Sequence, residues 1–152
     1  MTSLQTPLDA HPPTSGPETV TDFLLALEDA DIDRALSALT NDIQWINVSL
    51  PTVQGKAGVE RIFRSAQRAG GGFRVHFHTI AQAGDIVLTE RTDAVTLGRF
   101  EHRFWVVGRF ELRDGKICVW RDAFDWGDLL VGFVRALAGI AVPALNRPWP
   151  DE

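Results

Sequence analysis

The chain has 152 residues, of which 45% are hydrophobic and 23% are charged, so its size and composition are those of one globular domain. The net charge is -5 and no basic stripe is visible, which argues against nucleic acid as a partner. The single cysteine, Cys118, cannot form an internal disulfide and therefore favours a cytoplasmic location. No uncharged apolar run reaches the roughly 18 residues of a membrane span, so none is predicted.

The N-terminal half of the chain contains helical and extended patterns. Residues 1–16 lack the basic start and apolar run of a signal peptide, so they are predicted to be a flexible tail. Apolar residues then recur at helical spacing, which predicts a helix over about 17–30, a shorter one after the N-cap Asp31, and a third after Gly55. The β-prone run 43–48 lies between the second and third helices.

The C-terminal half changes to strand periodicity. Four long strand-like stretches are joined by short turns, which favours antiparallel neighbours over parallel strands with helical crossovers. These strands are predicted at about 73–83, 86–97, 100–112 and 116–125. A final apolar helix at about 128–140 completes a single domain over 17–142, and residues 143–152 are predicted to be a Pro-rich tail.

Helices followed by a run of hairpins predict an α+β fold. The sheet, which is mixed but mostly antiparallel, must curve around the N-terminal helices to bury their apolar faces. A curved sheet closed at one end by helices forms a cone, and such a cone encloses a ligand pocket as well as a core.

Several enzyme classes are excluded by what the sequence lacks. There is no tyrosine, and the motifs G-x-S-x-G, H-E-x-x-H, paired C-x-x-C and G-x-x-x-x-G-K-[ST] are absent. His76 and His78 alternate along one predicted strand without a third ligand at metal spacing. Serine-nucleophile hydrolases of the familiar type, zinc proteases and P-loop NTPases are therefore excluded, and no metal site is predicted.

Strand alternation places several polar side chains on faces that also carry apolar residues. Arg91 and Asp93 share a face of the second long strand with aliphatic residues, and Asp122 lies between two large aromatic residues on the last strand. Asn47 shares a face with Trp45 in the first β-prone run. These side chains are candidates for a polar site inside the cone.

Each of these positions has an alternative interpretation. Arg91 and Asp93 can form an ordinary solvated ion pair, Asp122 can lie on the surface, and Asn47 can be a turn former before Pro51. An acidic side chain inside an apolar cone is unfavourable unless it is paired. One arginine can serve two carboxylates, and such a triad separates their pKa values so that one acts as acid and the other as base.

Three motifs carry a resemblance to a known family. They are W-I-N-V-S-L-P at 45–51, L-T-E-R-T-D at 88–93 and G-K-I-C-V-W-R-D-A-F-D at 115–125. Together with the helices, which extend the likeness over roughly 17–130, they resemble the limonene-1,2-epoxide hydrolase family. That family has the cone-shaped α+β fold shared by nuclear transport factor 2 and ketosteroid isomerase.

The resemblance implies a role for each polar residue. Asp93 fills the position of the acid that protonates the epoxide oxygen, and Asp122 that of the base that takes a proton from the attacking water. Arg91 matches the arginine that bridges the two carboxyls, and Asn47 matches the asparagine that helps to hold the water. At Trp45 the chain departs from the family, which has a water-holding tyrosine there. An indole donates one hydrogen bond but accepts none.

The resemblance implies a cofactor-independent epoxide hydrolase that converts a lipophilic epoxide and water into a vicinal diol in one concerted step. The predicted aromatic lining, formed by Trp45, Phe104, Trp120 and Phe124, favours a bulky apolar substrate. A ketosteroid isomerase or polyketide cyclase of the same fold is one alternative. Such an isomerase typically uses a tyrosine, which is absent here, and a cyclase needs only one catalytic aspartate. A non-catalytic small-molecule-binding domain is the other alternative.

A homodimer is predicted from the strand at 100–112. Its outward face carries Trp105 and Val107 among charged residues, and an exposed aromatic surface rimmed by charge is typical of an interface. Members of the fold family commonly pair through this face. The alternative is that the C-terminal segment covers the face within one chain.

Overall fold

The computed structural model describes residues 15–150 of the chain. Most of the segment predicted as an N-terminal tail, and the last two residues of the predicted Pro-rich tail, lie outside the described residues. In chain order the elements are α1 (Gly16–Glu28), α2 (Ile32–Ser37), β1 (Leu39–Asn47), β2 (Val53–Gln54), α3 (Lys56–Arg68), β3 (Gly71–Ala83), β4 (Ile86–Leu97), β5 (Phe100–Arg113), β6 (Lys116–Ala123), α4 (Trp126–Ala141) and the 3-10 helix η1 (Pro143–Leu145). The predicted helices and long strands are confirmed, and β2 is added to them.

The first two helices begin at side-chain caps that can be read in the sequence. Ser15 accepts a hydrogen bond from the backbone N–H of Glu18, whose carboxylate accepts one from the backbone N–H of Ser15, so the pair forms a capping box. At α2 the side chain of Asp31 accepts from the backbone N–H of Arg34 at 3.1 Å. Asp31 is therefore the N-cap that the sequence predicted.

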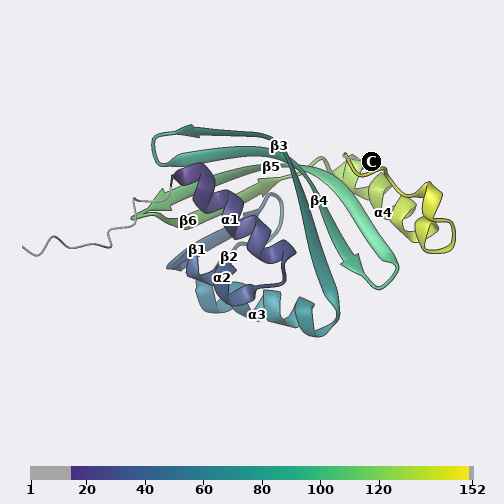
Figure 1. The fold of residues 1–152 in the computed structure, drawn as a ribbon, viewed down its shortest axis with the longest axis horizontal. Coiled ribbons are helices and arrows are strands. Elements are labelled where there is room, and N and C mark those ends of the chain that lie inside the picture. Colours follow the sequence, from purple (N-terminus) through teal and green to yellow (C-terminus); the bar gives the residue numbers. More distant parts are fainter. Residues whose placement is uncertain (1–14, 151–152) are drawn as a thin grey trace, which may run out of the picture.

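The six strands form one mixed sheet in the order β2-β1-β6-β5-β4-β3. The pair formed by β1 and β6 is parallel, and the other four pairs are antiparallel. Figure 1 shows the sheet curving around α1, α2 and α3, with α4 at the far end of the molecule. The predicted cone, a curved and mostly antiparallel sheet closed by N-terminal helices, is confirmed.

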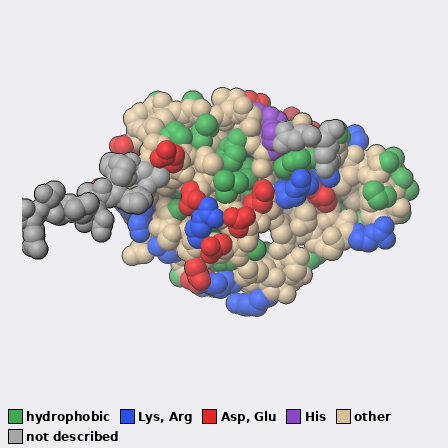
Figure 2. All heavy atoms as spheres, viewed as in Figure 1, with side chains coloured by type: hydrophobic (Ala, Val, Ile, Leu, Met, Phe, Trp, Pro, Cys, Tyr) green, Lys and Arg blue, Asp and Glu red, His purple; other side chains and the backbone are tan. Residues whose placement is uncertain are grey.

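The core lies between the N-terminal helices and the sheet. Val20, Phe23 and Leu24 of α1 are fully buried, and the ring of Phe23 meets the indole of Trp120 edge-on at a centroid distance of 5.1 Å. The outer side of the helices is charged, and Figure 2 shows acidic and basic side chains mixed there. The helices thus bury one apolar face against the sheet and present a polar face to water.

The C-terminal segment packs on the half of β5 that projects beyond β6. Only residues 107–113 of β5 pair with β6, and α4 contacts the free half through a hydrogen bond between the His102 ring and the Leu129 carbonyl at 3.0 Å. The Asn146 side chain then donates to the Glu101 carbonyl at 2.9 Å, and Trp149 is buried under the guanidinium of Arg74. The described part of the segment predicted as a tail therefore packs against the domain.

No helix within residues 15–150 combines the length and apolar character needed to cross a membrane.

Candidate active site

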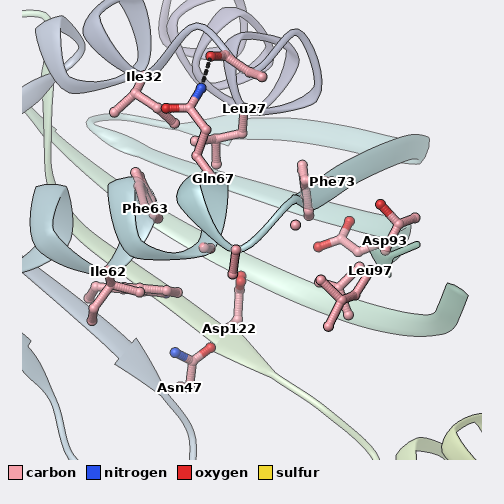
Figure 3. A pocket seen from close by; sticks show the side chains of 18 of the residues that line it. Leu27, Ile32, Asn47, Ile62, Phe63, Gln67, Phe73, Asp93, Leu97 and Asp122 are labelled. Atoms are coloured by element: carbon pink, nitrogen blue, oxygen red, sulfur yellow. Dashed lines mark hydrogen bonds between the residues drawn. The ribbon is translucent and has the colours of Figure 1, made fainter. Parts of the chain in front are cut away.

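The cone contains a cavity of about 550 Å³ whose walls are mostly apolar. Its lining comes from both layers of the fold: the end of α1 and start of α2, the inner face of α3, and the strands β1, β3, β4, β5 and β6. Figure 3 shows Leu27, Ile32 and Phe63 from the helices facing Asp93, Asp122 and Asn47 from the sheet. Apart from Gln67 of α3, whose amide nitrogen donates to the Ala30 carbonyl at 2.9 Å, the polar side chains of the cavity project from the sheet into an apolar space.

A fully buried arginine joins the two predicted carboxyls. The Nε–H of Arg91 donates to Asp93, with distances of 2.9 and 3.0 Å to its two oxygens. Nη2 donates to Asp122 Oδ2 at 2.7 Å, and Nη1 donates to the Thr89 hydroxyl at 2.9 Å. Arg91 is 0% exposed, and the residues Asp93 and Asp122 are 3% and 4% exposed. Burial on this scale excludes the alternative of a solvated ion pair.

The register of three neighbouring strands explains how this contact forms. Gly108 on β5 lies opposite Thr89 on β4 and opposite Asp122 on β6. The guanidinium of Arg91 passes over this glycine to reach the carboxyl on the far strand. A Cβ at position 108 would lie 2.2 Å from Arg91 Nη1, so only glycine leaves room for the bridge.

The parallel pairing of β1 with β6 brings the remaining predicted residues to the site. Asn47 lies opposite Asp122, and Trp45 lies opposite Trp120. The two indoles stack at a centroid distance of 4.7 Å with 10° between their planes, and the ring of Phe63 meets Trp45 edge-on at 5.6 Å. In Figure 3 the Asn47 amide and the Asp122 carboxyl both project from neighbouring strands into the cavity.

Burial and charge act in opposite directions on the two carboxyls. Burial raises the pKa of Asp93 and of Asp122 above the ordinary aspartate value, and the guanidinium of Arg91 lowers both. The charge of Asp122 raises the pKa of Asp93 further, and the result is about 7. Since one guanidinium neutralises one carboxylate, burial and the second negative charge favour the state in which one of the two carboxyls keeps its proton.

The structure brings all the sequence-predicted site residues to one place. The cavity is lined by Asn47, Asp93 and Asp122 together with the four predicted aromatic residues, Trp45, Phe104, Trp120 and Phe124. Arg91 lies beneath the surface, between the two carboxyls.

Sequence reasoning missed two residues that hold the arginine, Thr89 and Gly108. Thr89 lies two residues before Arg91 on the same strand face, so alternation could have found it. Gly108 interrupts a long strand, which is a known sign that another group approaches the backbone closely.

Within the described part of the chain, no group of three or more His, Cys, Asp or Glu side chains is arranged to hold a metal ion.

A curved α+β cone with two buried carboxyls on one guanidinium defines a class of acid–base site, and comparison with known proteins gives the family. The profile of the limonene-1,2-epoxide hydrolase catalytic domain matches residues 14–135. Epoxide hydrolase EphG of Mycobacterium tuberculosis (strain H37Rv) is 40% identical over 124 residues, which are 82% of this chain and 83% of that protein.

Solved structures agree with this match. The structure of an M. tuberculosis LEH-like epoxide hydrolase has a TM-score of 0.84 and 38% identity, covering 88% of this chain and 95% of that chain. The chain therefore belongs to the limonene-1,2-epoxide hydrolase family. An NTF2-like protein of unknown function from Burkholderia pseudomallei K96243, with a TM-score of 0.65 and 19% identity over 76% of this chain and 95% of that chain, shares the fold alone.

Proposed function

We propose that this epoxide hydrolase adds water to a bulky lipophilic epoxide in one concerted acid–base step that yields a vicinal diol. The observation that carries the proposal is the pair of buried carboxyls that share Arg91 and face one apolar cavity. A binding domain has no need of two carboxyls inside its apolar pocket, where burial disfavours their charge. A cyclase, the enzymatic alternative, needs only one of them.

In the proposed step Asp122 is the base and Asp93 is the acid. The Asp122 carboxylate takes a proton from water as the water oxygen attacks a ring carbon. The carbon–oxygen bond of the ring breaks, and the Asp93 carboxyl protonates the leaving oxygen. The diol then leaves, and a proton returns from Asp122 to Asp93 to restore the starting state. Acid and base catalysis each contribute about 10²–10⁴-fold.

The electrostatics of the triad support this division of roles. The ionised form of Asp122 is stabilised by its 2.7 Å bond to Arg91 Nη2. That negative charge in turn raises the pKa of Asp93, so Asp93 keeps its proton to a higher pH. One proton shared between two unequal carboxyls is what a concerted acid–base step requires.

The catalytic rate is expected to fall as the pH rises through about 7, because the pKa of Asp93 is about 7 and the acid must retain its proton. The direction follows from the raised pKa: the active, protonated form predominates below that value and is lost above it. The measurement is kcat/KM between pH 5 and 9 with a neutral epoxide, while circular dichroism monitors folding. A rate that keeps increasing to pH 9 would contradict the assignment of Asp93 as the acid.

The water-holding residues are expected to differ in importance. We assign the water to Asn47 and Asp122, whose side-chain oxygens accept hydrogen bonds from its two O–H groups and so direct a lone pair at the epoxide carbon. Trp45 packs between Trp120 and Phe63, and its contribution is mainly to that packing.

Trp45→Phe is therefore expected to retain a sizeable fraction of wild-type kcat, whereas Asn47→Ala is expected to lose most of it. Steady-state kinetics of both variants with the same epoxide make the comparison. If Trp45→Phe is as damaging as Asp122→Asn, the indole N–H takes part in catalysis and the assignment is wrong.

Diol formation from a panel of terpenoid, steroid and fatty epoxides tests the proposed function. The aromatic cavity predicts turnover of bulky apolar members and weak turnover of small polar ones, measured by mass spectrometry of the diols. This preference would suit the removal of lipid or xenobiotic epoxides. Isomerisation of a β,γ-unsaturated ketosteroid without any diol from the panel would favour the isomerase alternative instead.

We also propose a homodimer in the cytoplasm, where the free thiol of Cys118 would stay reduced. Trp105 on the outward face of β5 is 42% exposed. Exposed apolar side chains also lie along α4, namely Leu130, Val131, Phe133, Val134 and Leu137. The C-terminal segment covers Glu101 and contacts Arg103 but leaves this surface open.

Sedimentation equilibrium at micromolar concentration is expected to give twice the 16.8 kDa chain mass. A single species at the chain mass would reject the dimer.

A further inference from the structure

Three buried polar atoms around the base lack a hydrogen-bond partner within the described residues. They are the indole nitrogens of Trp45 and Trp120 and the Oδ1 oxygen of Asp122. The two nitrogens are donors and the oxygen is an acceptor. Buried groups of this kind are rarely left unpaired in folded proteins, so their presence at one site calls for a functional explanation.

Trp120 is the donor that is held in a fixed position beside the base. It lies two residues before Asp122 on the same strand and is 4% exposed. Its indole stacks between Trp45 at 4.7 Å and Phe110 at 6.2 Å, with interplanar angles of 10° and 12°. A ring stacked on both faces has little freedom to turn, so the core fixes the direction of its N–H.

Asp122 is held firmly through one of its oxygens only. Oδ2 accepts from Arg91, while Oδ1 is closed off from solvent and has no donor. The charged groups that β4 brings near this carboxyl are Arg91, which contacts it, and Asp93, which lies on the other side of Arg91. From β1 and β5 the register places the uncharged Asn47 and Gly108 opposite it. A second fixed donor would orient the plane of the Asp122 carboxyl and offset the free-energy cost of burying its charge.

We propose that the Trp120 indole N–H donates to Asp122 Oδ1 in the reactive state, which makes Trp120 a positioning residue that keeps the base ionised and oriented toward the water. The inference rests on the proposed role of Asp122 as the base. The effect of each neighbour on the carboxyl supports it. Burial raises the pKa of Asp122, and Arg91 and the indole N–H of Trp120 lower it. Trp45 does not lower the pKa of Asp122, although the indole N–H of Trp45 is also buried.

The pH profile of kcat/KM tests the proposal, because its acid limb reports ionisation of the base. In Trp120→Phe the lost donor raises the pKa of Asp122, so the acid limb is expected to move up by about one pH unit, which is about tenfold in rate below the limb. The basic limb, assigned to Asp93, is expected to stay in place. Trp45→Phe, which also removes a buried indole N–H from the same stack, is expected to leave the acid limb where it is.

A second substitution separates hydrogen bonding from packing. Benzothienylalanine at position 120 keeps the shape of tryptophan but has sulfur in place of the N–H, so it is expected to reproduce the shift of the acid limb with little loss of thermal stability. If both position-120 variants keep the wild-type limb, the proposal is wrong and Trp120 only packs. If Asp122→Asn retains activity, the assignment of the base fails instead, so the two failures are distinguishable.

Discussion

Asp93→Asn and Asp122→Asn are each expected to lower kcat by at least about 10²-fold while leaving the protein folded. Each substitution keeps the volume of the side chain and an oxygen that can accept from Arg91, so the buried network keeps its shape. An amide, however, neither protonates a leaving oxygen nor takes a proton from water. Steady-state kinetics with the best epoxide of the panel and thermal unfolding of each variant are the measurements.

The two variants are expected to fail for partly different reasons. In Asp122→Asn the negative charge that raises the pKa of Asp93 is gone, so the pKa of Asp93 falls and a smaller fraction of the acid is protonated at neutral pH, in addition to the loss of the base. In Asp93→Asn the base keeps its bond to Arg91. Asp114→Asn, which changes an exposed turn residue with a positive φ that asparagine tolerates, is the matched control and should behave as wild type. Activity near wild type in either site variant would contradict the assigned roles.

Gly108→Ala is expected to abolish activity and to lower stability by about 3–5 kcal/mol, the usual loss when a buried ion pair is broken. The added Cβ would lie 2.2 Å from Arg91 Nη1 and 2.6 Å from the Thr89 hydroxyl. The guanidinium must therefore move, and it then loses its hold on two buried carboxyls. Urea unfolding and kcat measure the two effects.

Two further variants make the Gly108 result specific to the guanidinium. Gly127→Ala is the control for adding a methyl group, because its Cβ would meet only the exposed Asp125 side chain, at 3.2 Å, and a shift of a few tenths of an ångström would relieve that contact. Thr89→Val keeps the strand but removes the acceptor of the 2.9 Å bond from Arg91 Nη1. It is expected to lower the free energy of unfolding by about 1.5–3 kcal/mol. Wild-type activity in Gly108→Ala would show that the arginine does not need the space.

Much of the fold follows from local rules that the sequence obeys. The N-cap at Asp31, the short turns and the period-two alternation of the strands predicted the elements and their order. Alternation also placed Arg91, Asp93 and Asp122 on inward faces, because in a strand the side-chain direction is set by position alone. The residues that carry the proposed chemistry could therefore be named before their contacts were known.

Other features depend on register and on contacts between distant segments, which the sequence pattern does not contain. That Gly108 lies opposite both Thr89 and Asp122 follows only from the pairing of three strands. The burial of Trp149 under Arg74 joins residues far apart in the chain. The sequence pattern does not contain this contact, and for that reason the Pro-rich composition predicted a tail. The unpaired indole N–H of Trp120 likewise appears only when the stack of rings around it is assembled.

A single turnover in H₂¹⁸O, with enzyme in excess over epoxide, tests the one-step mechanism most directly. If water activated at Asp122 attacks the epoxide carbon, the diol of the first turnover carries one ¹⁸O atom and the protein carries none. Mass spectrometry of the diol and of the peptides that contain Asp93 and Asp122 detects both. An unlabelled diol together with ¹⁸O in one of these carboxyls after hydrolysis would show a covalent ester intermediate and would contradict the account.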